Sequence, residues 1–386
     1  MHVVHVITSL VVGGAERLLV DVARAQHAAG QTVSVVELGD PGPLREELTN
    51  EGIAVYSVSL AGLTDVPVAS HRLWRVLRRL RPGAVHTWMY HANVLGGAVA
   101  RLARIHRIVW SLHGTRDPTH RGFSFRVRLS AGVSPWVSRA VADAVVCTSE
   151  AARVEAVSAG YDRHQLVFVP NAVPLRAVDG EGGRAVRAEL GIAEDAPLVI
   201  HIGRYDPQKD HATFLEAFRH LAARLEDVHA VMCGRGVTWD QPQLEAAARA
   251  SGASERIHLL GPRDDVTRLQ AAADVLVSSS AFGESAPLAV LEAMAQRTPV
   301  VTTDVGDCAE IVGDTGLVAA PRDPPGIAEA VVELLREAPE QRRRRGDHAR
   351  HRVVTRYDFD RLLDDYASLY DGRALGQSAT SGWRRD

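Results

Sequence analysis

The sequence predicts an α/β protein made of two doubly wound domains, each with a mainly parallel sheet. Along the 386 residues, short runs rich in β-branched side chains alternate with longer segments of helical periodicity, which is typical of βαβ units. This alternation pauses at residues 174–183, PLRAVDGEGG, and then restarts, so this stretch is the expected linker. The length of 386 residues also favours two domains, because a domain has about 150 residues on average.

The first half carries six expected strands with helical segments between them. The strands are expected at residues 3–8, 32–38, 53–58, 84–88, 107–113 and 143–149, and the helices at 15–29, 43–51, 71–80, 91–103 and in the region up to about 141. Gly30 ends the first helix, and Arg81-Pro82-Gly83 ends the third, because neither glycine nor proline continues a helix well.

The second half repeats the pattern. Strands are expected at 196–204, 229–234, 256–261, 274–280 and 298–304, and helices at 210–224, 241–251, 264–272, 287–296, 326–337 and 358–372. The basic tract 341–346 is interpreted as a solvated helix end. Both halves are therefore of Rossmann type, and in a pair of such domains a ligand is expected in the crevice at the carboxyl ends of the strands.

Composition excludes several classes. Apolar residues make up 46% of the chain and charged residues 24%, which is ordinary for a globular protein with a core. The three cysteines, Cys147, Cys233 and Cys308, lie far apart and indicate a reducing, cytoplasmic environment without a structural metal. The apolar start lacks a basic leader and is interpreted as a first strand, and no apolar run approaches the ~18–20 residues of a membrane span.

The charge is unevenly distributed. Residues 1–180 carry a net charge of +5 and residues 181–386 a net charge of −8. The basic excess of the first half is modest and does not indicate nucleic acid as a partner. Among 44 basic residues, Lys209 is the only lysine, which suggests that arginine would not serve at this position.

The segment 282–313 has the strongest chemical pattern. Glu284 follows an expected strand, and Pro287 is expected in the first turn of the next helix, where its missing N–H costs nothing. The amides around Ser285, Ala286 and Leu288 would then face an anion at the helix N-terminus.

A second carboxylate, that of Glu292, lies eight residues after Glu284 in the same segment. Two carboxylates beside a phosphate site suit a phosphorylated sugar, whose hydroxyls donate hydrogen bonds. Alternatively, Glu284 only complements the helix dipole and Glu292 is a surface residue.

The pattern GES-x-PL-x-x-LEAMA, followed by TPVV-x-T-x-VG and AEIV, resembles the donor-binding signature of glycosyltransferase family 4. Other segments resemble family blocks in the same order, over about residues 3–370: GGAER, HG, CTSEA, VPNAV, HIGRYDPQKDHATFLEAF and LLGPRDDV. The resemblance implies the GT-B fold, in which two Rossmann-like domains face each other across a cleft. It implies an acceptor-binding domain at 1–173, a nucleotide-sugar-binding domain at 184–355, and a helix at 358–372 that packs back on the first domain.

The resemblance also implies a retaining transfer of a sugar, expected to be UDP-linked in this chain, to an acceptor hydroxyl, with an α-glycosidic product and without a metal or other cofactor. Arg204 and Lys209 would hold the donor pyrophosphate, although they could instead pair with Asp206 or Asp210. His113 would bind a hydroxyl of the donor sugar, with a positioning role. The catalytic set expected on this basis is His113, Glu284, Arg204 and Lys209.

The remaining donor contacts surround this set. Gly13 and Gly14 allow backbone N–H groups to approach a phosphate, although a Gly pair is also common in plain turns. Gly234 and the 261–265 loop, with Pro262 and Arg263, would lie near the base, and Glu292 would hold the ribose. The pairs Asp264-Asp265 and Asp364-Asp365 are interpreted as surface or capping residues and not as metal ligands.

The acceptor is the least determined partner. The residues expected to face it are Glu16, Arg116, Phe123 and Phe125. A glycan, a lipid-linked sugar and a small natural product such as an aminocyclitol all remain open. The basic helix at 71–81 could rest on an anionic membrane, but an ordinary helix that covers the sheet is favoured.

Other functions compete with transfer. A sugar-nucleotide epimerase or hydrolase of the same fold would need no acceptor, and a non-catalytic sugar-nucleotide-binding protein would share the donor contacts. A phosphorylase would need a second lysine for pyridoxal phosphate. A nicotinamide dehydrogenase is excluded because neither half has GxGxxG after its first strand.

Overall fold

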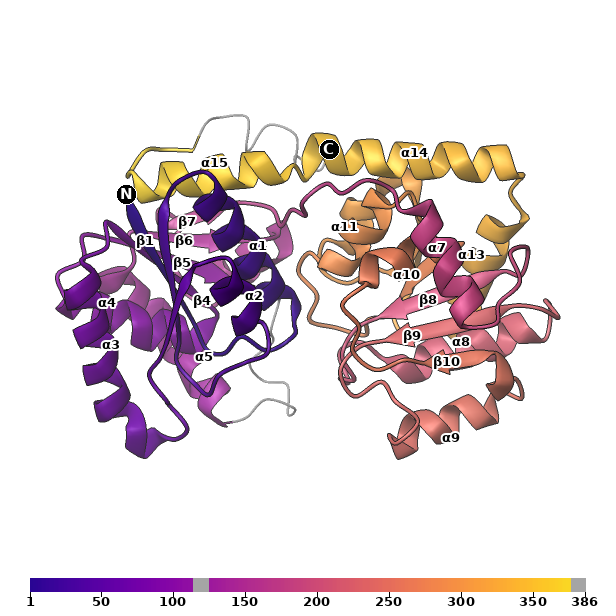
Figure 1. The fold of residues 1–386 in the computed structure, drawn as a ribbon, viewed down its shortest axis with the longest axis horizontal. Coiled ribbons are helices and arrows are strands. Elements are labelled where there is room, and N and C mark those ends of the chain that lie inside the picture. The colour runs from indigo at the N-terminus through magenta and orange to yellow at the C-terminus, as the bar shows by residue number, and fades with distance from the viewer. Residues whose placement is uncertain (114–124, 376–386) are drawn as a thin grey trace. The chain divides into compact units, whose positions relative to one another are not determined.

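The structure, a computed structural model, describes residues 1–113 and 125–375. The chain forms two compact units, one made of Met1–Asn171 with the chain from Phe359 onward, and the other of Ala172–Asp358. Each unit contains one parallel sheet with helices on both faces (Figure 1). This confirms the expected α/β fold of two Rossmann-like sheets.

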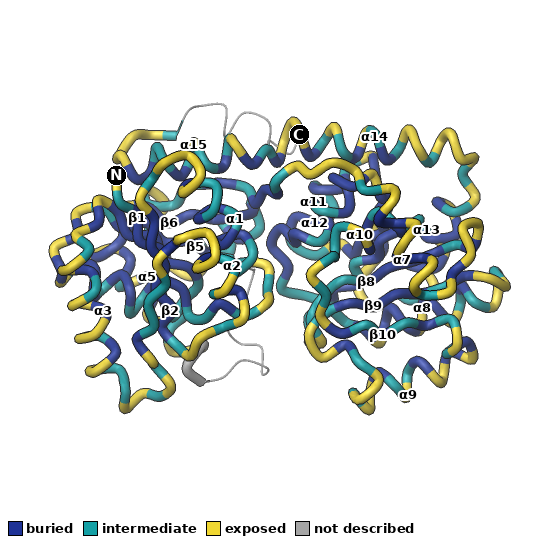
Figure 2. The backbone as a smooth tube through the Cα atoms, in the orientation of Figure 1, coloured by how far each residue is buried: buried dark blue, intermediate teal, exposed yellow. Residues whose placement is uncertain are grey.

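The first unit has seven parallel strands in the order β3-β2-β1-β4-β5-β6-β7. The strands are β1 (His2–Ile7), β2 (Thr32–Glu37), β3 (Ala54–Ser57), β4 (Ala84–Trp88), β5 (Arg107–Leu112), β6 (Ala144–Cys147) and β7 (Leu166–Phe168). The inner strand β1 pairs with both β2 and β4, so that Val4 lies opposite Ser34 on one side and Val85 on the other. The five inner strands are almost entirely buried (Figure 2), which explains why they appear in the sequence as continuous apolar runs, whereas the edge strands β3 and β7 are only partly buried.

Helices cover the two faces of this sheet. They are α1 (Gly14–Ala28), α2 (Arg45–Asn50), the short η1 (Leu63–Asp65), α3 (Val66–Leu80), the π-helical η2 (Ala92–Gly96), α4 (Gly97–Leu102), α5 (Phe125–Val141), α6 (Glu150–Ser158) and α15 (Phe359–Tyr370). One buried cluster joins the inner residues of α3, α4, α5 and α6 to the strands, so these four helices share one face.

The last helix, α15, belongs to the first unit although it follows the whole second unit in sequence. The hydroxyl of Tyr370 lies 2.7 Å from Nδ1 of His86 on β4, and Arg107 on β5 donates to the carbonyl of Leu369. Both bonds are at least partly buried, so α15 is fixed to the middle of the sheet by polar contacts as well as by packing.

The second unit has six parallel strands in the order β10-β9-β8-β11-β12-β13. They are β8 (Leu198–Ile202), β9 (His229–Cys233), β10 (Ile257–Leu259), β11 (Val275–Ser278), β12 (Val300–Thr303) and β13 (Leu317–Ala319). The helices are α7 (Gly180–Glu189), α8 (His211–Ala222), α9 (Pro242–Ala250), η3 (Ser254–Arg256), α10 (Val266–Ala272), α11 (Leu288–Ala295), α12 (Cys308–Val312), η4 (Gly313–Thr315), α13 (Pro324–Arg336) and α14 (Pro339–Arg356).

Every strand expected from the sequence is present, with its ends shifted by at most about two residues, as is usual for element boundaries. The expected linker at 174–183 is wrong in its second part, because α7 begins at Gly180. Oδ1 of Asp179 accepts a hydrogen bond from the N–H of Gly182 at 2.8 Å and caps this helix. A Cβ at Gly183 would lie 2.9 Å from the backbone of Ala271, so the glycine allows α7 to pack closely on α10.

The basic tract 341–346 forms the first turns of α14. Its arginines are only partly solvated: Arg342 pairs with Asp274 at 3.2 Å and Arg345 donates to Glu337, while Arg343 and Arg344 are exposed. Across residues 1–113 and 125–375, no helix combines the length and the apolar character needed to cross a bilayer.

Candidate active site

The second sheet has a point at which its winding reverses direction, between β8 and β11. These strands are neighbours, and the chain proceeds outward from β8 to β9 and β10 on one side and from β11 to β12 and β13 on the other. The loops at the carboxyl ends of β8 and β11 diverge here, and this is where doubly wound sheets bind ligands. Lys209 lies in the loop after β8, and Glu284 lies in the loop after β11.

The structure brings Lys209 and Glu284 together. Nζ of Lys209 lies 2.5 Å from Oε1 of Glu284, and the side chains are only 17% and 6% exposed. The hydroxyl of Ser280 donates to the same oxygen at 2.7 Å. Two donors thus fix one carboxylate oxygen in a largely buried position, where an ion pair is stronger than at the surface.

Polar side chains on neighbouring elements hold the backbone of Lys209 in place. Its carbonyl accepts from the hydroxyl of Ser279 at 3.0 Å and lies 3.4 Å from Nε2 of His201. Nε2 of His211, in the first turn of α8, lies 3.3 Å from the carbonyl of Gly203. Burial lowers the pKa of His211 to about 4 and holds the pKa of His201 well below its usual value, so both rings are neutral beside the ammonium.

Two glycines permit close approach of the loops in this region. Gly306, at φ +60°, follows β12, and a Cβ there would overlap the carbonyl oxygen of Glu284. The N–H of Asp307 donates to the carbonyl of Ser285 at 3.0 Å, so the loops after β11 and β12 are joined. Gly234, at φ +153°, similarly lies against the backbone of Gly203, where any side chain would overlap.

The expected anion-facing segment lies directly before α11. Ser285, Ala286 and Leu288 are all buried, and α11 begins at Leu288. Pro287 is not in the first turn as expected: it is the residue before the helix, with an extended backbone at φ −68° and ψ 123°. Because the ring fixes φ and lacks an N–H, proline is still accommodated at this junction.

Glu292 is not an exposed surface residue. It lies half-buried on α11, and Nε2 of Gln270 on α10 donates to its Oε2 at 3.3 Å. The two carboxylates of the segment therefore have different environments, since Glu284 is paired with a cation and Glu292 with a neutral amide.

Arg204 and Arg263 have acidic neighbours. The Nε of Arg204 donates to Oδ2 of Asp206 at 3.0 Å, which is the pairing that the sequence left as an alternative. Arg263 donates to Asp265 at 2.7 Å and to Glu189 at 2.6 Å, and these carboxylates raise its pKa.

Asp265 is thus a partner of Arg263, and Asp210 caps α8 by accepting from Thr213. Pro262 is exposed, beside this paired arginine. Arg263 therefore has a structural role through these ion pairs, whereas its expected contact with a base remains a prediction.

In the first unit, Gly13 and Gly14 lie at the N-terminus of α1. Gly13 is extended and precedes the helix, and Gly14 is exposed with open space around it. The carboxylate of Glu16 folds back over Gly13, where a Cβ would overlap it. Arg116 and Phe123, expected to face the acceptor, lie outside the described residues, and Phe125 is the first residue of α5.

His113 directly follows β5 and stacks on the buried Trp88, with ring centroids 5.1 Å apart and an interplanar angle of 12°. Trp88 in turn donates from Nε1 to Nδ1 of His5 at 3.1 Å. Nε2 of His113 is buried and has no hydrogen-bond partner among the residues described. Burial lowers the pKa of His113 to about 3, so the ring is neutral and held flat against the indole.

Sequence reasoning missed several residues of this region. Two of them, Ser280 and Thr303, are connected to Glu284 by hydrogen bonds. The hydroxyl of Thr303 donates to the carbonyl of Ser280 at 2.6 Å, and the hydroxyl of Ser280 donates to Glu284. Gln208 links the two loops by donating to the carbonyl of Gly283 at 3.0 Å. The run of three serines after an apolar strand was the available signal for Ser280.

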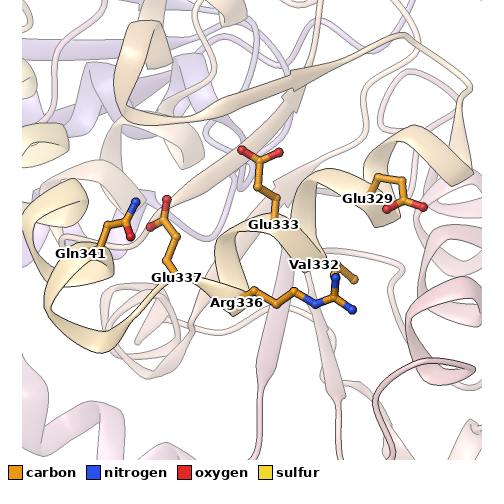
Figure 3. Close-up of a pocket in the computed structure, with 6 residues that line it drawn as sticks. All are labelled: Glu329, Val332, Glu333, Arg336, Glu337 and Gln341. Carbon is orange, nitrogen blue, oxygen red and sulfur yellow. The ribbon is translucent and has the colours of Figure 1, made fainter.

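A separate groove lies along the C-terminal half of α13 and the start of α14 (Figure 3). It is lined by Glu329, Val332, Glu333, Arg336, Glu337 and Gln341. None of the expected site residues lines it, and Glu337 is already paired with Arg345. No function is assigned to it. No group of three metal-ligating side chains is placed to hold a metal in the described parts of the chain, and metal independence stays a prediction.

Comparisons with known proteins place these features in a class. The family model described as "Glycosyl transferases group 1" matches residues 196–337, and the one described as "Glycosyltransferase Family 4" matches residues 12–177. Among solved structures, Anabaena HepE in complex with UDP-glucose superposes with a TM-score of 0.83 at 20% identity, over 96% of this chain and 100% of that one.

Two curated relatives extend over much of the chain. A phosphatidyl-myo-inositol mannosyltransferase of Mycobacterium leprae is 28% identical over 95% of both chains. An alpha-D-kanosaminyltransferase of Streptomyces kanamyceticus is 26% identical over 68% of this chain and 70% of its own.

The two Rossmann-like sheets and these matches define a glycosyltransferase of the GT-B fold. The chain belongs to glycosyltransferase family 4, whose enzymes are of the retaining class.

Proposed function

We propose that this protein transfers a hexosyl group from a UDP-linked sugar to a hydroxyl of a cyclitol acceptor, with retention and without a metal ion. The observation that carries the proposal is the buried pair of Lys209 and Glu284 at the point where the second sheet reverses its winding. HepE, of the same fold, binds UDP-glucose, which supports the choice of donor. The name of the Mycobacterium relative specifies an inositol lipid, which supports a cyclitol acceptor.

In this proposal the donor pyrophosphate lies at Arg204, at Lys209 and at the backbone N–H groups of Ser285, Ala286 and Leu288. When the bond between C1 and the β-phosphate oxygen breaks, positive charge develops on the sugar ring and negative charge on the phosphate. Preorganised cations and amides stabilise that negative charge, and this electrostatic contribution is the largest that the site offers. The anchored Lys209 is suited to it because its ammonium is already oriented by Glu284.

The other residues would position the donor. Glu284 would accept hydrogen bonds from sugar hydroxyls, and neutral His113 would offer a ring nitrogen to another hydroxyl. Glu292 would accept from the ribose, and Gly234 would leave room for the base. The acceptor oxygen attacks C1 on the face that the phosphate leaves, and the departing phosphate takes the proton of the acceptor hydroxyl.

Donor use is tested by thermal unfolding with a panel of nucleoside diphosphate sugars. A donor at 100 times its dissociation constant stabilises the folded protein by about 2.7 kcal/mol, so the true donor should raise the Tm clearly. We expect a UDP-sugar to give the largest shift and EDTA to leave it unchanged. The absence of a shift with every donor would overturn the proposal.

Transfer is then tested with the stabilising donor and a panel of acceptors: myo-inositol, an aminocyclitol, a phosphatidylinositol and a linear glycan. We expect an α-linked product with a cyclitol. The anomeric signal in the NMR spectrum of the product identifies the linkage. Product with the glycan alone would contradict the acceptor class. Release of an isomerised or hydrolysed donor, equally fast without any acceptor, would identify the enzyme as an epimerase or hydrolase.

A further inference from the structure

The outer surface of α3, α4 and α5 in the first unit has an unusual charge composition. The three helices together contain eight arginines and no acidic residue, in a chain whose net charge is −3. Arg101 on α4 pairs with Asp143, outside these helices, at 3.2 Å, but no carboxylate within α3, α4 or α5 balances the other arginines.

These three helices lie on the same face of the sheet. α3 contacts α4, and α4 contacts α5. Their inner side chains belong to one buried cluster, to which α3 contributes Leu73 and Leu77, α4 contributes Val99, and α5 contributes Val141. Their polar side chains therefore face outward together, and Figure 2 shows the outer turns of α3 as exposed.

The exposed arginines of α3, and Arg81 directly after it, have no acidic partners among the residues that the structure describes. Arg75, Arg78, Arg79 and Arg81 are all exposed, and none forms an ion pair within residues 1–113 and 125–375. Arginines elsewhere in the unit do form such pairs; Arg153, for example, lies 2.5 Å from Glu150. The charge of α3 is thus left available to an external anion.

Large apolar side chains are exposed among these arginines. Leu102 on α4 is 75% exposed, and Trp136 on α5 is 73% exposed. Leu129 and Val133 precede Trp136 at helical spacing, so the three form one exposed stripe on α5. The guanidinium of Arg139 lies 5.1 Å from the centre of the Trp136 ring, so a cation accompanies this stripe as well.

We propose that this surface, formed by the outward side chains of α3, α4 and α5, docks on an anionic lipid bilayer. Unpaired guanidiniums fit lipid phosphates, and exposed tryptophan and leucine side chains fit the apolar layer just beneath them. A polyanion such as RNA would satisfy the arginines but would not cover Leu102 and Trp136 with apolar atoms. The proposal is independent of the donor and acceptor proposed above.

The sequence favoured an ordinary covering role for the helix at 71–81. The inner face of α3 does cover the sheet, through Ala69, Leu73 and Leu77. What the sequence alone did not show is that α4 and α5 extend the same basic and apolar surface on the same side.

The test is co-sedimentation of the full-length protein with vesicles. The vesicles contain phosphatidylcholine with about 30% phosphatidylglycerol, a roughly physiological fraction of acidic lipid. We expect the protein to bind them at low salt and to bind more weakly as the ionic strength rises. We expect little binding to vesicles of pure phosphatidylcholine. Removal of three charges in Arg75→Gln/Arg78→Gln/Arg79→Gln should lower the partition coefficient about 100-fold, because each basic residue near an anionic surface contributes about fivefold.

A matched control removes three charges from the second unit, in Arg336→Gln/Arg343→Gln/Arg344→Gln. This variant should bind vesicles like the wild type, and both triple variants should keep the wild-type Tm shift with donor. Trp136→Ser should reduce quenching of tryptophan fluorescence by brominated lipids. The proposal would be overturned by no binding at low salt, by equal losses in the two triple variants, or by tighter binding to RNA than to anionic vesicles.

Discussion

Nζ of Lys209 and Oε1 of Glu284 are 2.5 Å apart, although the residues are separated by 75 positions in the sequence. The contact exists because β8 and β11 are neighbours in the sheet, so the loops that follow them meet. Removing either partner would therefore affect both the stability of these loops and the chemistry proposed for them.

We expect Lys209→Ala to lower kcat by about 100-fold or more, as when a preorganised oxyanion donor is lost. It should also destabilise the fold by about 3 kcal/mol, because the largely buried carboxylate of Glu284 loses its cation. Steady-state kinetics and urea unfolding measure the two effects.

The double variant Lys209→Met/Glu284→Gln separates these effects. Without a charge on either side chain, it should regain most of the lost stability but none of the activity. If kcat recovers together with stability, the role of Lys209 is structural and its contact with the pyrophosphate is refuted.

Gly306→Ala should destabilise the protein by more than the ~1 kcal/mol expected for alanine in a left-handed conformation, because the new Cβ would displace the carbonyl of Glu284. Donor affinity, measured by calorimetry, should fall about tenfold or more. Gly191→Ala is the matched control, since Gly191 has φ +68° and open space around it. Equal behaviour of the two variants would show that the contact with Glu284 is unimportant.

Tyr370→Phe should loosen α15. It removes the hydroxyl bonded to Nδ1 of His86 and leaves a buried polar atom unpaired, which costs about 1–3 kcal/mol. Hydrogen exchange should increase in α15, β4 and β5 and remain unchanged in the second unit. Tyr205→Phe, at a side chain 37% exposed, is the control. Uniform exchange changes across the chain would contradict a local role.

The protein should lose stability as the pH falls from 6.5 to 4. Burial lowers the pKa of His5 to about 4, so within this window the unfolded chain binds a proton that the folded chain does not. The contribution is complete above pH 6.5 and decreases by about 1.4 kcal/mol per pH unit for such a histidine. His113 and His211, whose pKa values burial lowers to about 3 and 4, add to the effect.

Urea unfolding at pH 7, 6 and 5 measures this dependence. In His5→Gln the slope of the unfolding free energy against pH should be shallower by up to about 1.4 kcal/mol per pH unit, which corresponds to one proton. An unchanged slope would mean that His5 is not the neutral buried group that its bonds to Gln26 and Trp88 indicate.

The order of strands and helices could be predicted because the apolar runs of buried parallel strands are a local signal. Helix α7 could not, since Gly182 and Gly183 argue against a helix until α10 is seen beside them. Tertiary packing there overrides a poor intrinsic preference. The small strand β13 and helix α12 are too short to give a periodic pattern.

The sequence also did not show which charged side chains of the site pair with one another. The sequence indicated Lys209 and Glu284 separately, and only the neighbouring positions of β8 and β11 show that they form a pair. For Arg204 the sequence offered two roles, and its bond to Asp206 is a local contact of the kind that the spacing allows. The partner Glu189 of Arg263 lies 74 residues away, on a helix that was not expected.

The return of α15 to the first unit has a consequence for biosynthesis. On the ribosome, the strands of the seven-stranded sheet are made first, but the helix that supplies Tyr366 and Tyr370 is made only after the whole second unit. Part of one face of this sheet therefore remains uncovered by α15 while the second unit is synthesised. A stop codon after Asp358 would spare every residue of the second unit and yet damage the first.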